Sequence, residues 1–280
     1  MRGKARLDKR RRHAHLDAMI AYSRFAPALL AGLLLAAPAS AQVTFDQHNA
    51  DYSECLKLAA KDPDAAIARA KAWWDKGANF AARHCLGVAL AQKEQYVQAG
   101  KIFEDLAADA MEEILPFKAD LYGQAGQAYY LAGLNERAIG AFDRALAIKP
   151  GNADLLIDRA VARDDAGHFF EAIDDLNAAI DSDANRPEAW LYRAAAYRHV
   201  GSFDLALDDA NRAVALSQRS VEALFERAQV KEARKDLAGA REDFQALIKS
   251  APKSIQAQEA AKRLKTLGQT PAPRAPAKKP

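Results

Sequence analysis

Residues 119–150 read ADLYGQAGQAYYLAGLNERAIGAFDRALAIKP, and they decide how the chain folds. Tyr122 and Tyr129 recur at the spacing of one helical face, and Phe142 lies on the apolar face of a second helical pattern. Gly133 separates the two patterns, at a place where helices commonly end in a left-handed residue. The stretch therefore predicts two helices joined by a short turn.

The same pattern returns along the chain at a spacing of about 34 residues. Small residues that let the two helices of a pair approach each other recur as Ala138, Ala172, Ala206 and Ala240. Turn glycines recur as Gly133, Gly167 and Gly201, and large apolar side chains recur as Tyr122, Leu156, Trp190 and Leu224. Each helix pair has an apolar face that it cannot bury alone, so the pairs are expected to stack.

These repeated columns resemble the tetratricopeptide repeat, a helix–turn–helix unit of about the same length. The resemblance covers roughly residues 80–267, and a degenerate unit precedes it. The chain is thereby identified as a member of this family, of the exported bacterial type. The resemblance implies an all-α fold, a right-handed α-solenoid of stacked helix–turn–helix repeats.

The pattern divides the chain into six segments. They are a cleaved signal peptide at 1–41, a linker and degenerate repeat at 42–79, a repeat with an insertion at 80–118, four regular repeats at 119–254, a capping helix at 255–268 and a disordered tail at 269–280. The linker itself is expected at 42–50 and the inserted residues at 114–118. The tail is too polar and too rich in proline to fold, and it is basic.

The first 41 residues are typical of a secretory leader. A basic opening precedes the apolar run FAPALLAGLLLAAP at 25–38, which is too short to span a bilayer comfortably, and small residues follow up to Ala41. We expect cleavage after Ala41, which would release a periplasmic chain, beginning at Gln42, that is not inserted in the membrane. Two alternatives stay open: translation from Met19 would give a shorter leader, and an uncleaved segment would form an anchor or a helix of the fold.

Cys55 and Cys85 are the only two cysteines, and an oxidising compartment favours a disulfide between them. Both fall on predicted first helices of adjacent repeats, so the pairing is geometrically reasonable. Closing a loop of about 30 residues would stabilise the fold by roughly 3 kcal/mol in the chain-entropy model. The alternative is a pair of buried thiols. No CxxC or CxxCH pattern is present, so redox catalysis is not expected.

The net charge of +3 is unevenly placed. Residues 1–24 hold eight basic and two acidic side chains, which leaves 32 basic and 35 acidic residues in 25–280 and a net charge of −3 there. Residues 25–280 lack the excess of positive charge that binds the phosphates of nucleic acid, so nucleic acid is not expected as a partner.

The family resemblance implies a concave groove, lined by the first helix of each repeat, that binds a peptide or protein segment. The corresponding positions are Gln127, Tyr130, Leu131, Ile157, Val161, Asp164, Asp165, Leu191, Ala195, Arg198, His199, Phe225, Gln229 and Glu232. One subgroup of the family holds a C-terminal carboxylate with Lys and Asn, but the matching positions here are Ile157, Val161, Leu191 and Ala195. We therefore expect a segment with apolar anchors and some basic character instead of a carboxylate clamp.

Charged residues also recur once in each repeat. One column of arginines faces one column of aspartates: Arg159, Arg193 and Arg227 with Asp175, Asp209 and Asp243. They predict a structural ladder of contacts between packed helices, and an anion-binding stripe is the alternative. Acids at Asp120, Asp154, Glu188 and Glu222 fall in first helical turns, where the helix dipole favours them, and an acidic ridge is the alternative.

No motif for catalysis, metal binding or phosphate binding is present. HExxH, GxGxxG and Gly-Lys-Ser patterns are missing, and the histidines are scattered. We expect no catalytic residue, no metal and no cofactor. The leading hypothesis is an exported scaffold that binds a protein or peptide in envelope assembly or secretion. The alternative is an architectural protein of the cell envelope that self-associates or acts as a spacer.

Overall fold

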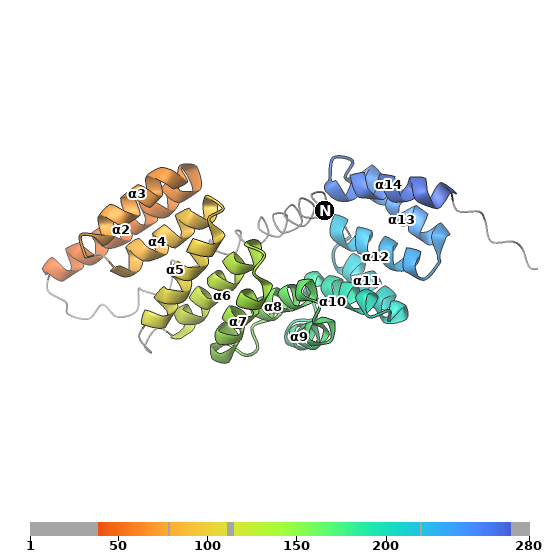
Figure 1. The fold of residues 1–280 in the computed structure, drawn as a ribbon, viewed down its shortest axis with the longest axis horizontal. Helices are drawn as coiled ribbons and strands as arrows, with labels where there is room; N and C mark the ends of the chain where they lie inside the picture. Colours follow the sequence, from red (N-terminus) through yellow and green to blue (C-terminus); the bar gives the residue numbers. More distant parts are fainter. Residues whose placement is uncertain (1–38, 78, 111–114, 219, 270–280) are drawn as a thin grey trace, which may run out of the picture. The chain divides into compact units, whose positions relative to one another are not determined.

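A computed structural model describes residues 39–77, 79–110, 115–218 and 220–269. These residues form thirteen helices and no strand (Figure 1), which confirms the predicted all-α solenoid of helix–turn–helix repeats. The chain divides between Lys149 and Pro150 into two compact units, called unit 1 and unit 2 below. Most of the expected signal peptide and of the expected tail lies outside the described residues.

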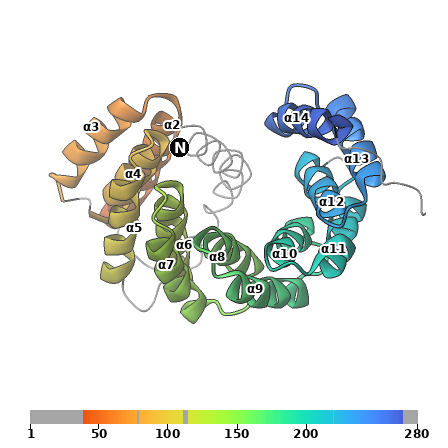
Figure 2. The same ribbon diagram turned by 45° about the vertical axis from the view of Figure 1, so that its right-hand side comes forward.

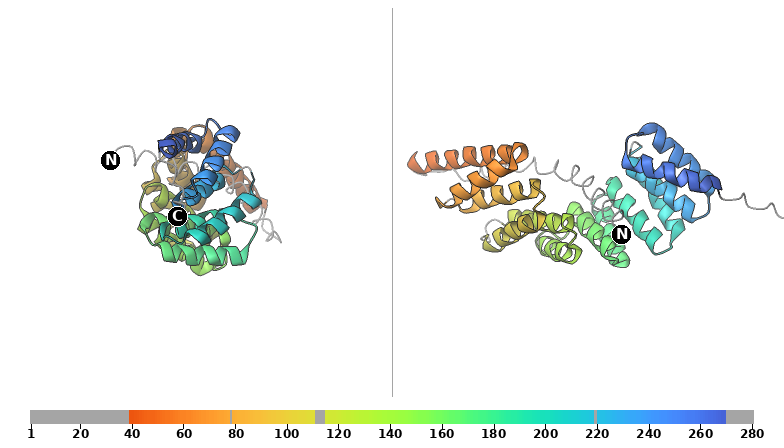
Figure 3. Two further views of the ribbon diagram at one scale, coloured as in Figure 1. Left: turned by 90° about the vertical axis from the view of Figure 1, so that its right-hand side faces the viewer. Right: turned by 45° about the horizontal axis from the view of Figure 1, so that its top comes forward.

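Unit 1 consists of three helix pairs in which each helix packs against the next along the chain. Its helices are α2 (Ala39–Lys61), α3 (Pro63–Trp74), α4 (Asn79–Gln92), α5 (Tyr96–Asp109), α6 (Leu115–Leu131) and α7 (Asn135–Ile148). The first helices α2 and α4 also touch each other directly, and Figure 3 shows the layering of this unit.

Unit 2 holds three further pairs and a single last helix. Its helices are α8 (Ala153–Ala166), α9 (Phe169–Ser182), α10 (Pro187–His199), α11 (Phe203–Leu216), α12 (Val221–Ala233), α13 (Leu237–Ser250) and α14 (Ile255–Gln269). The first helix α10 packs against both α8 and α12, and it lies between them in Figure 2. Helix α14 covers α12 and α13, as expected of a capping helix.

Two element boundaries differ from the prediction. Helix α2 begins at Ala39, so residues 42–50 are helical instead of forming a linker. This stretch contains no glycine or proline, so nothing in it stops the helix. Helix α6 begins at Leu115, so most of the inserted residues at 114–118 lengthen a first helix. Pro116 is tolerated there because it lies in the first helical turn.

In five of the six described pairs, the turn between the two helices contains a left-handed residue. Gly133, Gly167 and Gly201 have φ values of 79°, 89° and 80°, which confirms the role predicted for these glycines. The equivalent turns in the second and sixth pairs use Glu94 and Lys235, at φ values of 59° and 68°. These turns therefore adopt the left-handed backbone conformation even where the residue is not glycine.

The two helices of a pair approach closely where small residues face aromatic rings. Ala138, Ala172, Ala206 and Ala240 are fully buried. At Gly126, an added Cβ would lie 2.6 Å from Cε1 of Phe142, whose side chain is only 1% exposed. The ring thus occupies the space that any larger residue at Gly126 would need.

A disulfide ties the degenerate first pair to the second. Cys55 of α2 and Cys85 of α4 are bonded, with Cα atoms 6.2 Å apart, and both are fully buried. The expected bond is therefore present. It joins two neighbouring first helices, α2 and α4.

His84, the residue before Cys85, forms a polar centre in the core of unit 1. Its Nδ1 lies 2.8 Å from the Tyr52 hydroxyl, and its Nε2 lies 3.0 Å from Oε1 of Gln124. The rings of Phe103 and Phe117 lie 5.6 and 6.0 Å from the imidazole. Burial lowers the pKa of His84 to about 4, although the hydrogen bond with Gln124 opposes this. In the neutral ring, Nδ1 accepts a hydrogen bond from the Tyr52 hydroxyl and the Nε2–H group donates one to Oε1 of Gln124.

Gly126→Ala is expected to destabilise unit 1 by about 1–3 kcal/mol, because Phe142 must move to admit the methyl group. Gly140→Ala is the matched control, since an added Cβ there meets nothing within 4 Å. This control lies inside α7 and should stabilise the protein by about 0.5–1 kcal/mol. Urea denaturation followed by circular dichroism measures both changes. Equal effects of the two substitutions would contradict the proposed close packing.

The folded state should lose stability as the pH falls from about 6.5 to about 4. In this window the unfolded chain protonates His84, whereas the folded chain keeps its pKa near 4. Keeping His84 neutral contributes on the order of 3 kcal/mol to the free energy of unfolding. This contribution is fully present at pH values above the pKa of the histidine in the unfolded chain. Urea denaturation across this pH range should show that the free energy of unfolding falls less for His84→Gln than for the parent. His168→Gln, at an exposed position in unit 2, is the control and should lose as much stability as the parent.

Candidate functional site

Most of the predicted groove residues lie on three neighbouring helices of unit 2. Helix α8 carries Ile157, Val161, Asp164 and Asp165, helix α10 carries Leu191, Ala195, Arg198 and His199, and helix α12 carries Phe225, Gln229 and Glu232. Because α10 packs against both α8 and α12, the structure brings these three sets together. Gln127, Tyr130 and Leu131 lie on α6 and belong to unit 1.

The apolar members of this set are mostly buried. Ile157, Val161 and Phe225 are 5%, 7% and 9% exposed, so they support the packing of the repeats. Phe225 contacts Phe244 of its own helix pair, with ring centroids 5.8 Å apart. In unit 2, the partly exposed apolar positions of the predicted groove are Leu191 and Ala195. Among the predicted groove residues of unit 2, these two residues of α10 are the apolar side chains that a ligand could contact.

The two basic members of the set in unit 2 are paired with acids. Nδ1 of His199 lies 2.9 Å from Oδ1 of Asp164, which links the last turns of α10 and α8. Arg198 donates from Nε to Glu226 at 2.5 Å and from Nη2 at 3.3 Å, which links α10 to α12. Glu226 also accepts a hydrogen bond from Gln229. Arg198 and His199 therefore hold neighbouring repeats together.

Glu226 is a buried partner of a predicted groove residue, and the sequence did not predict it. It is only 4% exposed, and its carboxylate neutralises Arg198 inside the unit. The two residues are 28 positions apart and occupy different columns of the repeat. No single column could therefore have revealed this pair.

The acidic members of the set in unit 2 are Asp164, Asp165 and Glu232. Asp165 is exposed, and the side chains of Asp164 and Glu232 are 20% and 23% exposed. Glu232 forms an ion pair with Arg263 of α14 at 3.0 Å. With Arg198 bound to Glu226, these three carboxylates dominate the charge of the predicted groove residues in unit 2.

The predicted ladder of arginines and aspartates is present in all three pairs of unit 2. Each arginine donates two hydrogen bonds to the aspartate sixteen residues later, at distances of 2.5–2.9 Å. Arg193 also donates to Asn177 at 2.7 Å, which joins one pair to the next. Burial alone would raise the pKa of Asp243, but hydrogen bonds from Arg227 and Lys231 hold it below its usual value. The contacts of these arginines favour the structural interpretation over an anion-binding stripe.

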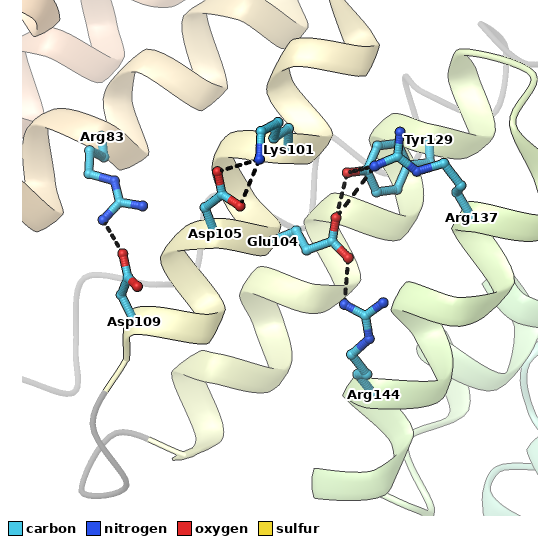
Figure 4. A network of polar contacts seen from close by, with 8 residues as sticks. All are labelled: Arg83, Lys101, Glu104, Asp105, Asp109, Tyr129, Arg137 and Arg144. Atoms are coloured by element: carbon cyan, nitrogen blue, oxygen red, sulfur yellow. Dashed lines mark hydrogen bonds and ion pairs between the residues drawn. The ribbon is translucent and has the colours of Figure 1, made fainter.

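Unit 1 contains a different polar network, centred on Glu104 (Figure 4). Its carboxylate accepts from the Tyr129 hydroxyl at 2.6 Å and from Arg144 at 2.5 Å. Arg137 donates to the Tyr129 hydroxyl at 2.8 Å and lies 4.1 Å above the tyrosine ring. Burial would raise the pKa of Glu104, but hydrogen bonds from Tyr129 and Arg144 hold it below its usual value. The network fastens α5 to α6 and α7.

Asp154, Glu188 and Glu222 lie in first helical turns as predicted, but Asp120 lies in the second turn of α6, because that helix begins at Leu115. Acids of this column also make contacts with neighbouring segments. Asp120 forms an ion pair with Lys149 at 2.5 Å, and Asp154 forms one with Arg186. Glu222 accepts a hydrogen bond from Gln256 at 3.2 Å. These contacts tie the start of a first helix to the segment that follows its pair. They favour the structural interpretation of this column.

The described residues offer neither a metal cluster nor a membrane span. No group of three or more histidine, cysteine, aspartate or glutamate side chains in the described part could hold a metal ion. None of the described helices is both long and apolar enough to cross a membrane.

Comparison with known proteins agrees with the architecture. The tetratricopeptide repeat family matches residues 86–153, 157–221 and 200–255, which together make up more than half of the chain. No curated protein matches the sequence.

Several solved structures are similar to this chain. MamA, residues 41 to the end, from Desulfovibrio magneticus RS-1 is similar with a TM-score of 0.54 and 15% identity, over 62% of this chain and 95% of that chain. YrrB, described as a TPR protein with an unusual peptide-binding site, has a TM-score of 0.50 and 18% identity, over 69% of this chain and 96% of that chain. The first TPR domain of Spaghetti (RPAP3), bound to an HSP90 peptide, has a TM-score of 0.39 and 27% identity, over 42% of this chain and 90% of that chain.

The likeness to MamA and YrrB concerns the fold, and it agrees with the repeated helix pairs described above. The ranges matched to the family contain the recurring small and turn residues that build these pairs. The chain belongs to the tetratricopeptide repeat family.

Proposed function

We propose that the mature chain is an exported, periplasmic scaffold that binds a segment of a partner protein in envelope assembly or secretion. The segment lies across the first helices of unit 2, with basic residues facing the acids there. The observation that carries this proposal is the packing of α10 between α8 and α12, which aligns the predicted groove residues of three repeats. Peptide or protein binding is what the family resemblance implies.

The charge of this face supports a partner segment with basic character. Asp164, Asp165 and Glu232 lie on its helices, while Arg198 is neutralised by Glu226. A cationic segment gains attraction from these carboxylates, and an acidic segment is repelled. Leu191 and Ala195 provide a small apolar contact between the acids, which suits short apolar anchors more than bulky ones.

Two features support export. The first 41 residues have the basic, apolar and small-residue order of a secretory leader. The buried bond between Cys55 and Cys85 is of a kind that persists in oxidising compartments such as the bacterial periplasm. Both features point to the same compartment.

Neutralising the acids of the face should weaken partner binding. The double variant Asp165→Asn and Glu232→Gln, made in the full chain, is expected to lower capture of crosslinked partners from native envelopes roughly tenfold. Binding by the parent should also weaken as salt increases, because exposed charges are screened. Quantitative mass spectrometry of the crosslinked products measures the change.

The matched control is Asp174→Asn with Asp208→Asn. Both residues are exposed acids, and they lie on the second helices α9 and α11. This variant has the same change in net charge and should capture partners as well as the parent does. Equal capture by the two double variants would show that the acidic first-helix face is not the binding surface.

Export itself has a separate test. Expression of the full sequence in a bacterial host should yield a periplasmic product whose first residue is Gln42, because the leader would be cut after Ala41. N-terminal sequencing and intact mass determine the cleavage point. A product that retains residues upstream of Gln42, or that stays in the cytoplasm, would contradict this part of the proposal.

A further inference from the structure

The first helix pair, α2 and α3, has a core of small side chains. Among the side chains that the structure describes in these two helices, the fully buried ones are Cys55, Ala59, Ala66 and Ala70. The later helices of unit 1 bury large side chains to 3% exposure or less: Phe103 in α5, Leu121 and Tyr129 in α6, and Phe142 in α7. Hydrophobic stabilisation grows with the apolar area that is buried, so apolar packing holds the first pair less firmly than it holds the later helices.

Polar contacts from the first pair to later helices include two with exposed partners. Lys93, just after α4, forms an ion pair with Asp64 of α3, and the two side chains are 40% and 73% exposed. Exposed ion pairs contribute little to stability. The guanidinium group of Arg83 lies 5.7 Å from the ring of Trp74, which is 38% exposed. These two contacts are therefore weak attachments of α3 to the next pair.

Within the first pair, α2 and α3 are bonded to each other. Arg69 of α3 donates a hydrogen bond to Asp51 at 3.1 Å and another to Glu54 at 2.9 Å, and both acids lie on α2. Ala59 of α2 and Ala66 of α3 also belong to one buried cluster. The two helices thus keep contacts with each other that do not depend on α4.

The disulfide is the covalent link between this pair and the rest of unit 1. Cys55 of α2 and Cys85 of α4 are 30 residues apart, and the loop that they close contains all of α3. A cross-link lowers the entropy of the state in which its loop is open, so it favours docking of the pair on α4. Both cysteines are 0% exposed, so a reagent reaches their sulfur atoms only when the pair moves away from α4.

We propose that the first helix pair is a redox-dependent element, docked on α4 in the disulfide-bonded protein and undocked when Cys55 and Cys85 are thiols. Reduction by a dithiol breaks the S–S bond, each sulfur gains one electron and one proton, and the dithiol is oxidised to its own disulfide. Undocking uncovers Cys85 and Ala89 on α4, which contact the pair. The helices from α5 onward stay folded, because they bury large side chains of their own. The pair is therefore docked in an oxidising compartment and undocked in a reducing one.

Hydrogen exchange followed by mass spectrometry, on the protein with and without dithiothreitol, tests the proposal. Reduction should increase the exchange rate of the amides of α2 and α3 about a hundredfold, as expected from opening a cross-linked loop of about 30 residues. The amides of α7 in unit 1 and of α10 to α13 in unit 2 should exchange at the same rate in both states. Unchanged exchange in α2 and α3, or an equal increase in these later helices, would overturn the proposal.

The double variant Cys55→Ala and Cys85→Ala is the matched control, because it lacks the bond with or without reductant. It should exchange as the reduced parent does, and dithiothreitol should not change its exchange.

Alkylation is the second measurement. Both thiols of the reduced parent should react with iodoacetamide nearly as fast as they do in urea, whereas a docked pair would shield them. Resistance of either thiol, or slow exchange in α2 and α3 of the variant, would contradict redox-dependent docking. These assays need neither export nor a partner, so their outcome is separate from the tests of the proposed function.

Discussion

The fold depends on how closely the two helices of each pair approach. Gly126 leaves room for the ring of Phe142, and fully buried alanines recur at Ala138, Ala172, Ala206 and Ala240. This approach turns each pair into a rigid block with an apolar face, and stacking the blocks completes the core. A left-handed residue follows the first helix in every pair from α4 and α5 to α12 and α13, and Glu94 and Lys235 adopt that conformation without being glycine.

Close packing also requires that the buried charged side chains of unit 2 be paired. Asp175, Asp209 and Asp243 are only 4–5% exposed, and a buried carboxylate needs a partner that satisfies its oxygens. Arginines on the facing helices supply two hydrogen bonds to each of them. A second group of pairs, such as Arg198 with Glu226, links neighbouring repeats. Acids at the ends of the first helices are also paired, because Asp164 is hydrogen-bonded to His199 and Glu232 to Arg263.

Unit 1 departs from the regular pattern and uses other means to hold its repeats. The disulfide of Cys55 and Cys85 and the hydrogen bonds of His84 both join α2 to its neighbours. The network of Glu104, Tyr129 and two arginines replaces the ladder seen in unit 2. Among the described residues the pair of α2 and α3 has a neighbouring pair on one side only, and the covalent bond adds to that contact.

The sequence by itself determined the features that return once in every repeat. The helix pairs, the left-handed glycines and the bonds from Arg193 to Asp209 lie within one pair, so local spacing was enough to predict them. Only the tertiary structure decided that Ile157 and Phe225 are buried and that His199 pairs with Asp164, and the role of the predicted groove residues as a ligand surface stays a prediction. These features depend on how neighbouring repeats pack, which brings together positions from different columns. The helical start of α2 at Ala39 was also missed, although residues 42–50 contain no glycine or proline that would stop a helix.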